Sequence, residues 1–306
     1  MYPKILVLLG GLTATIFAVD LGAQTAAAPS PPRPTNFGAI KAACVIGDVS
    51  AVNQETQEVV PLHNDDLLFQ HYAIKTSANS SIVLVFSNGS TVRLGASAEL
   101  VIHEFLQDPF AESGLAMNGL KQEPVPSSTK LRLERGELTG HVTKLHRDST
   151  YNVEIPCGVA GIRGTTFRHV YRPNANGGGL FSAATSEGTV VFTGPDGKEV
   201  PVPADVELSG RVRPRGGFAM FDTNPISPRT ATIMEHHAKV MVQQAQRVVF
   251  RKTDVGSAKG PKPALKRDPQ AKRETVDDTK DIEKEFQDRE KALRAAPKAA
   301  PAKKKK

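Results

Sequence analysis

A glycine-rich stretch with one arginine is the part of this sequence whose residue types and spacing most suggest a ligand-binding loop. Its glycines recur at every third position from Gly158 to Gly164, and Arg163 precedes the last of them. Loops of this kind hold phosphate when they lead into a helix, whose N-terminal amides meet the anion. Here the glycines lead into residues 165–171, which have the pattern of a strand. We therefore interpret Arg163, Gly164 and Thr165 first as a tight structural bend, braced by the arginine, and only second as a binding set.

Histidines and cysteines are the other candidates for chemistry. The eight histidines are scattered and have no metal-ligand spacing with Cys, Asp or Glu, and the sequence has no Gly-x-Ser-x-Gly motif. We predict a protein that is not an enzyme and that holds no metal or cofactor. Cys44 and Cys157 could form a disulfide in an oxidising compartment or remain two buried thiols, and both alternatives stay open.

The basic charge of the chain is confined to its C-terminal part. The formal net charge of the 306 residues is +7, yet residues 251–306 alone hold 18 Lys and Arg against 10 Asp and Glu. The rest of the chain is therefore close to neutral, which argues against a nucleic-acid-binding body. The lysine-rich end could still attach weakly to anionic polymers.

Residues 1–28 have the pattern of a secretory signal peptide. Lys4 precedes an apolar run at residues 5–19, and small residues follow as far as Ala28. The run is shorter than the roughly 20 residues that span a bilayer. We predict cleavage between Ala23 and Ala28, with an uncleaved signal anchor as the alternative, and a periplasmic or envelope-associated chain in either case. Residues 29–36 follow as a proline-rich linker.

Residues 37–213 predict a mainly β domain of short hairpins. Apolar runs at residues 82–86 and 91–94 flank an Asn-Gly dipeptide, which is typical of a tight hairpin because both turn positions need positive φ. Residues 189–202 repeat this arrangement around an Asp-Gly dipeptide, and the region shows no helical period. This pattern fits a β-sandwich or a short β-solenoid.

The chain changes character after residue 228. Residues 229–250 lack Gly and Pro and carry apolar residues at helical spacing, which predicts one amphipathic helix packed on the sheet. Residues 251–306 carry too few large apolar residues to bury a core and predict a disordered tail. Within this tail, residues 278–295 have the pattern of a short charged helix around Ile282, Phe286 and Leu293.

Several of these motifs together resemble the FecR domain family. Residues 162–167, Ile-Arg-Gly-Thr-Thr-Phe, resemble the family signature V-R-G-T-x-F. Other family motifs occur in the expected order, at residues 47–49, 76–102, 131–138 and 185–191. The resemblance covers roughly residues 40–210.

The resemblance implies a jelly-roll-like β-sandwich outside the cytoplasmic membrane. Iron-uptake members of the family relay a signal from an outer-membrane receptor to a sigma factor through a cytoplasmic segment and a membrane span. Only residues 1–4 precede the apolar run here, and one helix and a tail follow Arg213. We therefore predict a stand-alone, non-catalytic, exported FecR-like interaction module that binds an envelope protein or glycan and acts in signal sensing or envelope scaffolding. The alternative is a structural protein that its lysine-rich tail tethers to anionic polymers; an enzyme acting on envelope polymers ranks third.

Overall fold

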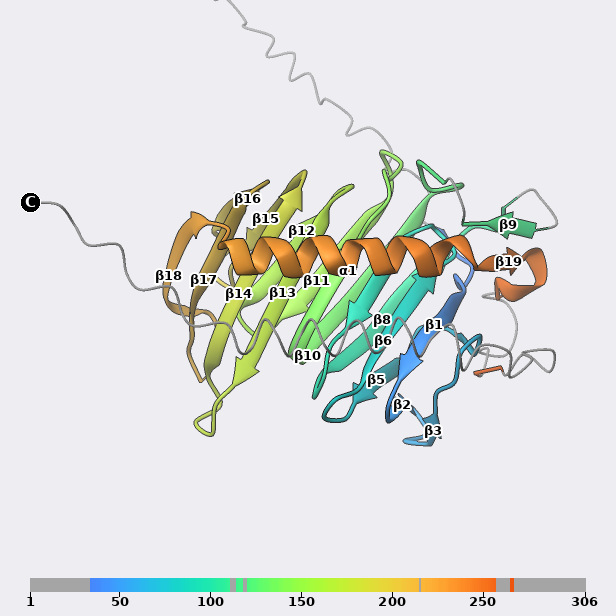
Figure 1. Ribbon diagram of the computed structural model, residues 1–306, viewed down its shortest axis with the longest axis horizontal. Coiled ribbons are helices and arrows are strands. Elements are labelled where there is room, and N and C mark those ends of the chain that lie inside the picture. Colours follow the sequence, from blue (N-terminus) through green and yellow to red (C-terminus); the bar gives the residue numbers. More distant parts are fainter. Residues whose placement is uncertain (1–33, 111–113, 118–119, 215, 257–264, 267–306) are drawn as a thin grey trace, which may run out of the picture. The chain divides into compact units, whose positions relative to one another are not determined.

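The computed structural model describes residues 34–110, 114–117, 120–214, 216–256 and 265–266. Within them the chain is mainly β, and seventeen strands form two sheets that share one long strand (Figure 1). Sheet A has the order β3-β2-β5-β8-β10-β11-β12-β15-β16, and sheet B has the order β4-β1-β6-β7-β10-β13-β14-β17-β18. Neighbouring strands are antiparallel except for β10 and β11, which are parallel. The expected mainly β sandwich with one helix is confirmed.

The strands of sheet A are β2 (Val49–Asn53), β3 (Val59–Pro61), β5 (Tyr72–Thr76), β8 (Glu99–Gln107), β10 (Ser127–His141), β11 (Thr150–Ile155), β12 (Gly158–Ile162), β15 (Thr189–Thr193) and β16 (Glu199–Pro203). Sheet B adds β1 (Ile40–Ile46), β4 (Leu67–Leu68), β6 (Ser81–Phe86), β7 (Thr91–Leu94), β13 (Thr166–Pro173), β14 (Gly179–Glu187), β17 (Val206–Val212) and β18 (Phe218–Pro225). The remaining elements are β9 (Gly114–Ala116), which pairs with β19 (Val249–Arg251), the helix α1 (Pro228–Gln246) and the short 3-10 helix η1 (Lys252–Asp254).

Strand β10 passes from one sheet to the other at Gly136. Its first part pairs with β8 and β11 in sheet A, and from Gly136 onward it pairs with β13 in sheet B. Gly136 has φ +96°, a backbone conformation that residues with a side chain rarely adopt. A Cβ at this position would lie 2.2 Å from the Cβ of Ala98, so the crossing needs glycine both for its backbone angle and for space.

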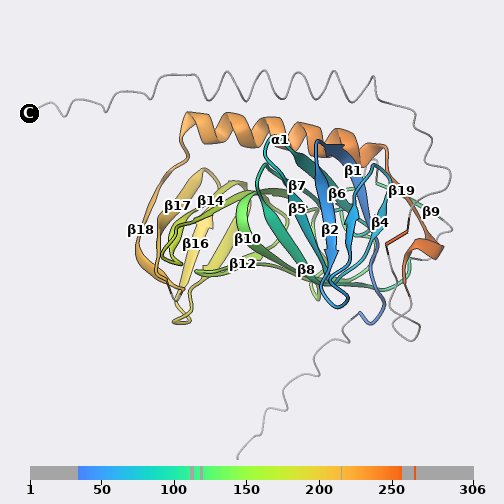
Figure 2. The ribbon, with the colours of Figure 1, turned by 90° about the horizontal axis from the view of Figure 1, so that it is seen from below.

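The main core lies between the two sheets. It contains apolar side chains from both, such as Leu84 and Phe167 of sheet B and Leu131 and Phe192 of sheet A. The helix α1 covers the outer face of sheet B, where it contacts β1, β6, β7, β10, β13 and β14 (Figures 1 and 2). A second apolar cluster forms there, in which Val240 and Met241 of α1 meet Val83 and Val85 of β6. Among the described residues, no helix is long and apolar enough to cross a membrane.

Two hairpin turns form where the Gly-containing dipeptides predict them, but by a different geometry. Gly89 has φ +88°, whereas Asn88 does not have positive φ. The Asn88 side chain instead accepts a hydrogen bond from the Ser90 amide at 3.0 Å and donates one to Ser127 Oγ at 3.0 Å. The turn is closed by backbone hydrogen bonds, from the Gly89 amide to the Phe86 carbonyl and from the Phe86 amide to the Ser90 carbonyl, both at 2.9 Å. Only Gly89 has positive φ, so the prediction that both positions need positive φ is wrong here.

The structure also moves the expected domain boundaries. Gly216 and Gly217, with φ of +84° and +72°, form a turn into β18, so the sandwich extends beyond the expected end at residue 213. The helix begins at Pro228 and ends at Gln246, and residues 249–251 form a strand rather than helix. Residues 251–256 and 265–266 pack on the body, where Gly256 bridges Phe37 and Lys266 bridges Leu67, which corrects the expected start of the tail at 251. The predicted signal peptide, residues 1–28, and residues 267–306 lie outside the described residues.

We predict that Gly136→Ala lowers the free energy of unfolding by about 2 kcal/mol or more, from backbone strain and overlap with Ala98 combined. The matched control is Gly197→Ala, because Gly197 also has positive φ, +75°, but no atom lies within 4 Å of an added Cβ. The control should lose about 1 kcal/mol, the cost of the backbone angle alone. Denaturant unfolding followed by circular dichroism measures both, and equal losses would show that the crossing does not need the close approach.

Candidate functional site

The expected signature bend joins β12 to β13. Arg163 donates from Nη2 to the carbonyl oxygens of His146, at 3.1 Å, and Arg147, at 2.9 Å. Gly164 takes φ +64°, and the buried Thr165 accepts a hydrogen bond from the Val142 amide through its carbonyl oxygen, at 2.9 Å. The glycine stretch itself, from Gly158 to Ile162, forms strand β12. The three residues thus lie together at a turn, where the arginine contacts backbone carbonyls of the loop that follows β10.

A buried glutamate holds the same loop from its other side. Glu123 is 2% exposed and accepts hydrogen bonds from the Ser127 hydroxyl at 2.7 Å, from the Ser149 hydroxyl and from the His146 amide. Glu123 cannot be found from the sequence, because a glutamate in a proline-rich loop has no distinguishing pattern. The hydrogen bonds of Glu123 and Arg163 therefore hold the loop after β10 from two sides, next to the bend between β12 and β13.

The two cysteines are not joined to one another. Cys157 lies in the core between the sheets, whereas Cys44 lies in the apolar cluster between sheet B and α1. The pairing of β1 with β6 shifts register between Ala42 and Cys44, which turns Cys44 toward the helix side of sheet B. The two cysteines therefore do not form a disulfide, because sheet B separates their thiols. Burial raises the pKa of Cys157 to about 12, so this thiol stays protonated.

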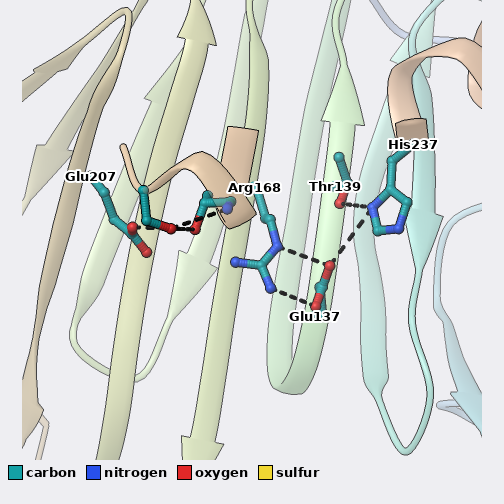
Figure 3. Close-up of polar contacts among 7 residues, drawn as sticks. Glu137, Thr139, Arg168, Glu207 and His237 are labelled. Carbon is teal, nitrogen blue, oxygen red and sulfur yellow. Dashed lines mark hydrogen bonds and ion pairs between the residues drawn. The ribbon is translucent and has the colours of Figure 1, made fainter. Parts of the chain in front are cut away.

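The described residues contain no group of three or more His, Cys, Asp or Glu side chains that could hold a metal ion. Instead, charged side chains gather on the outer face of sheet B. Glu137 of β10 and Arg168 of β13 form a two-fold hydrogen-bonded ion pair, with Nε to Oε1 at 2.9 Å and Nη2 to Oε2 at 2.7 Å (Figure 3). The antiparallel register of β10 and β13, with Thr139 opposite Arg168, brings these side chains together.

Helix α1 contacts this ion pair through His237. Its Nδ1 lies 2.9 Å from Thr139 Oγ1 and 3.7 Å from Glu137 Oε1 (Figure 3). We call Glu137, Thr139, Arg168 and His237, with the buried Arg93 of β7 opposite Thr139, the cluster beneath α1. This cluster is a polar part of the interface between α1 and sheet B, and the contacts near the end of the helix are apolar.

The first turn of α1 is held by a second set of polar contacts. Ser227 is the N-cap, and its hydroxyl accepts a hydrogen bond from the Thr230 amide at 3.1 Å. The Thr230 hydroxyl reaches Glu207 Oε2 of β17 at 3.5 Å (Figure 3). The helix is therefore positioned on sheet B by contacts at its start, in its middle at His237 and in the apolar cluster near its end.

Burial and the charges of the cluster together set the pKa values of its members. Burial, the largest influence on Glu137, raises the pKa of its carboxyl, but the charge and hydrogen bonds of Arg168, with the charges of Arg93 and Arg172, outweigh burial and hold the pKa below its usual value. Burial, and then Arg93, Arg168 and His236, lower the pKa of His237 well below its usual value. The cluster thus consists of an ionised glutamate, arginines and a neutral histidine. Such a set can orient a helix, and the Thr139 hydroxyl beside the histidine is fully buried.

A further buried histidine lies on the core side of β13. His169 packs against Phe167, with ring centroids 4.7 Å apart, and neither of its ring nitrogens has a hydrogen-bond partner among the described residues. Burial lowers its pKa to about 3, so the ring is neutral. Its place between core aromatics makes it a pH-sensitive part of the sandwich.

We predict that Glu137→Gln lowers the free energy of unfolding by about 2 kcal/mol, because Arg168 and Arg93 lose the carboxylate that compensates their partly buried charges. Lys239→Gln is the matched control on α1, since its ion pair with Glu235 is exposed and contributes at most about 0.5 kcal/mol. Thermal unfolding of both variants measures the difference. Equal small losses would contradict a role for the cluster in holding the helix.

We also predict that the free energy of unfolding falls as pH drops below 6.5. His169 and His237 are protonated in this range in the unfolded chain, but they stay neutral in the folded chain because burial lowers their pKa values. Each such histidine adds about 1.4 kcal/mol per pH unit to this loss. Between pH 6.5 and 4.5 the lowered pKa of Glu137 adds nothing, since its contribution disappears only below 4.5. We therefore expect the free energy of unfolding, measured with urea at several pH values in this window, to fall less steeply with decreasing pH in His169→Phe than in the parent. The exposed His103→Phe should keep the parent slope, and an unchanged slope in His169→Phe would contradict the assignment.

Comparison with known proteins gives one family match. Residues 72–191 match the model of the family described as FecR protein. They extend from β5 to β15 and include the crossing at Gly136 and the signature bend. No curated protein matches the chain.

Two crystal structures of a candidate anti-sigma factor from Parabacteroides distasonis ATCC 8503 are similar to part of the chain. Both have 13% sequence identity, and their TM-scores are 0.39 and 0.38. The similar part covers 54% of this chain and 64% of that protein, so this chain matches less than two thirds of its length.

Proposed function

Starting from the FecR-family domain that residues 72–191 form, we propose that the protein is a non-catalytic exported interaction module of the cell envelope with a role related to signal transduction. The observation that carries the proposal is the family match, because it falls on both sheets and on the strand that links them. An envelope protein or a glycan is the kind of partner that the module would bind.

The site geometry supports a binding role over a catalytic one. Arg163 and Glu123 contact loops of their own chain, and Glu137 contacts both Arg168 and, through His237, α1. These groups therefore act by positioning surfaces. Surface residues of the sandwich and of α1 would then form the contact with the partner.

Export is part of the proposal and rests on residues 1–28. A positive start, a 15-residue apolar run and small residues after it favour a cleaved signal peptide. N-terminal sequencing of the mature protein should find a start between residues 24 and 29. A chain that begins at Met1 and stays in the cytoplasm would contradict export.

A second candidate function is tethering by the tail. It is favoured by the excess of basic residues after residue 251 and by the four lysines at 303–306. Such attachment would weaken as salt rises, whereas a specific contact of the sandwich would not depend on these lysines.

One experiment separates the two functions. The experiment compares the full chain with a variant in which glutamine replaces all four lysines at 303–306. Each chain is expressed, cross-linked to its neighbours in cells and captured from envelope extracts. The module predicts that the same cross-linked partner appears with both chains in equal yield. Loss of envelope association in the glutamine variant would instead support tethering, and absence of any specific partner with either chain would contradict the module.

A further inference from the structure

One row of side chains on the outer face of sheet B is exposed beside α1. Arg172 of β13, Leu180 of β14, Arg211 of β17 and Met220 of β18 lie opposite one another across four adjacent strands. Leu180 is 57% exposed and Met220 is 59% exposed, and both arginines are exposed. Neither arginine forms an ion pair with another side chain in the described part of the chain. We call these four residues the exposed row.

The exposed row runs parallel to the row of residues on which α1 rests. That second row contains Arg168, Ala184 and Glu207, which are register partners on β13, β14 and β17. On each strand the two rows are four residues apart, which is about 13 Å along a strand. Packed helices lie 8–10 Å apart, so the exposed row leaves room for one more helix beside α1.

The exposed row has an order that a helix can match. Along it, basic and apolar side chains alternate, and the four strands span about 14 Å from first to last. A helix that fits must present acidic and apolar side chains in the same alternation over about ten residues, at a rise of 1.5 Å per residue.

The C-terminal part of the chain contains this pattern. Glu283, Phe286, Glu290 and Leu293 are spaced by three, four and three residues, which places them on one stripe of a helix. The ten-residue rise from Glu283 to Leu293 is about 15 Å. The stripe and the exposed row therefore have the same length and the same order of charged and apolar positions, and their charges are opposite.

We propose that residues 283–293 dock as a helix along the exposed row and cover this surface within the same molecule. The pairs are Glu283 with Arg172, Phe286 with Leu180, Glu290 with Arg211, and Leu293 with Met220. In the reverse direction both glutamates would meet apolar side chains, so the pattern specifies one orientation. The proposal goes beyond the function proposed above and does not rest on it.

The path of the chain permits this docking. Leu67 of β4 and Lys266 exchange backbone hydrogen bonds, at 2.8 and 3.0 Å, so the chain is fastened to the edge of sheet B before the segment begins. Five strand spacings, about 24 Å, separate β4 from β13. The 16 residues between Lys266 and Glu283 reach up to about 50 Å when extended, so they can cross this distance. The docked helix would run back toward β18, opposite in direction to α1.

The docked segment would be displaceable. A helix of this length is marginal in water by itself, and exposed ion pairs add little, so the sheet must supply most of the stabilisation. A partner with an acidic amphipathic helix could therefore compete for the same row. The exposed row would then be an interaction surface that the chain itself covers.

Disulfide trapping in the full chain tests the proposal. Met220→Cys is combined with Leu293→Cys, while the native Cys44 and Cys157 are buried and do not compete. The control combines Leu293→Cys with Val59→Cys, an equally exposed position on β3 of sheet A. Under mild oxidation the first pair should form an intramolecular disulfide at least about tenfold faster than the control, because docking raises the effective concentration of the two thiols. Equal rates, or cross-links only between two molecules, would overturn the proposal.

A charge swap tests the orientation of the docked segment. Arg211→Glu in the trapping variant should slow cross-linking, because it faces Glu290 with a like charge. Adding Glu290→Arg should restore the rate, and helix content by circular dichroism shows that the fold of α1 is kept. If Arg211→Glu leaves the cross-linking rate unchanged, or if adding Glu290→Arg does not restore the rate, the assigned register is overturned.

Discussion

The passage of β10 from one sheet to the other is the constraint on which the rest of this structure depends. A strand that leaves one sheet for another must turn sharply, and here Gly136 provides the turn with φ +96° against Ala98. The first part of the strand pairs with β8 and β11, and the second with β7 and β13. This one crossing links the two halves of the core and places Glu137 and Thr139 immediately after it, on the outer face of sheet B.

That outer face decides where α1 lies. Near the end of the helix, Val240 and Met241 enter an apolar cluster, while in its middle His237 meets Glu137 and Thr139. Apolar burial supplies stability without direction, whereas a hydrogen-bonded ion pair beneath a neutral histidine favours one placement of the helix. The arrangement of the helix also decides which strip of sheet B stays exposed and thus available to another segment or partner.

The FecR resemblance and the local patterns predicted much of the sandwich because hairpins are short-range features. The strands around residues 82–94 and 189–202 lie where apolar runs and Gly-containing turns predict them. The local patterns do not predict strands β12 and β18, since glycines that usually interrupt strands lie inside β12 and directly before β18. Arg163 was placed at a bend from its neighbours alone, but its partner carbonyls, on residues 146 and 147, could not be identified without the fold.

The sequence by itself determined the class of the fold, the helix after residue 228, the resemblance to the FecR signature and the confinement of basic charge to the C-terminal part, because each depends on residues close together in the chain. Only the tertiary structure decided which distant groups meet. Glu137 and Arg168 are 31 residues apart, and Thr139 and His237 are 98 apart. It also placed Cys44 and Cys157 on opposite sides of sheet B through one shift of register in β1. Strand register and the side to which a residue points depend on long-range pairing, because a shift of one residue turns a side chain to the other face.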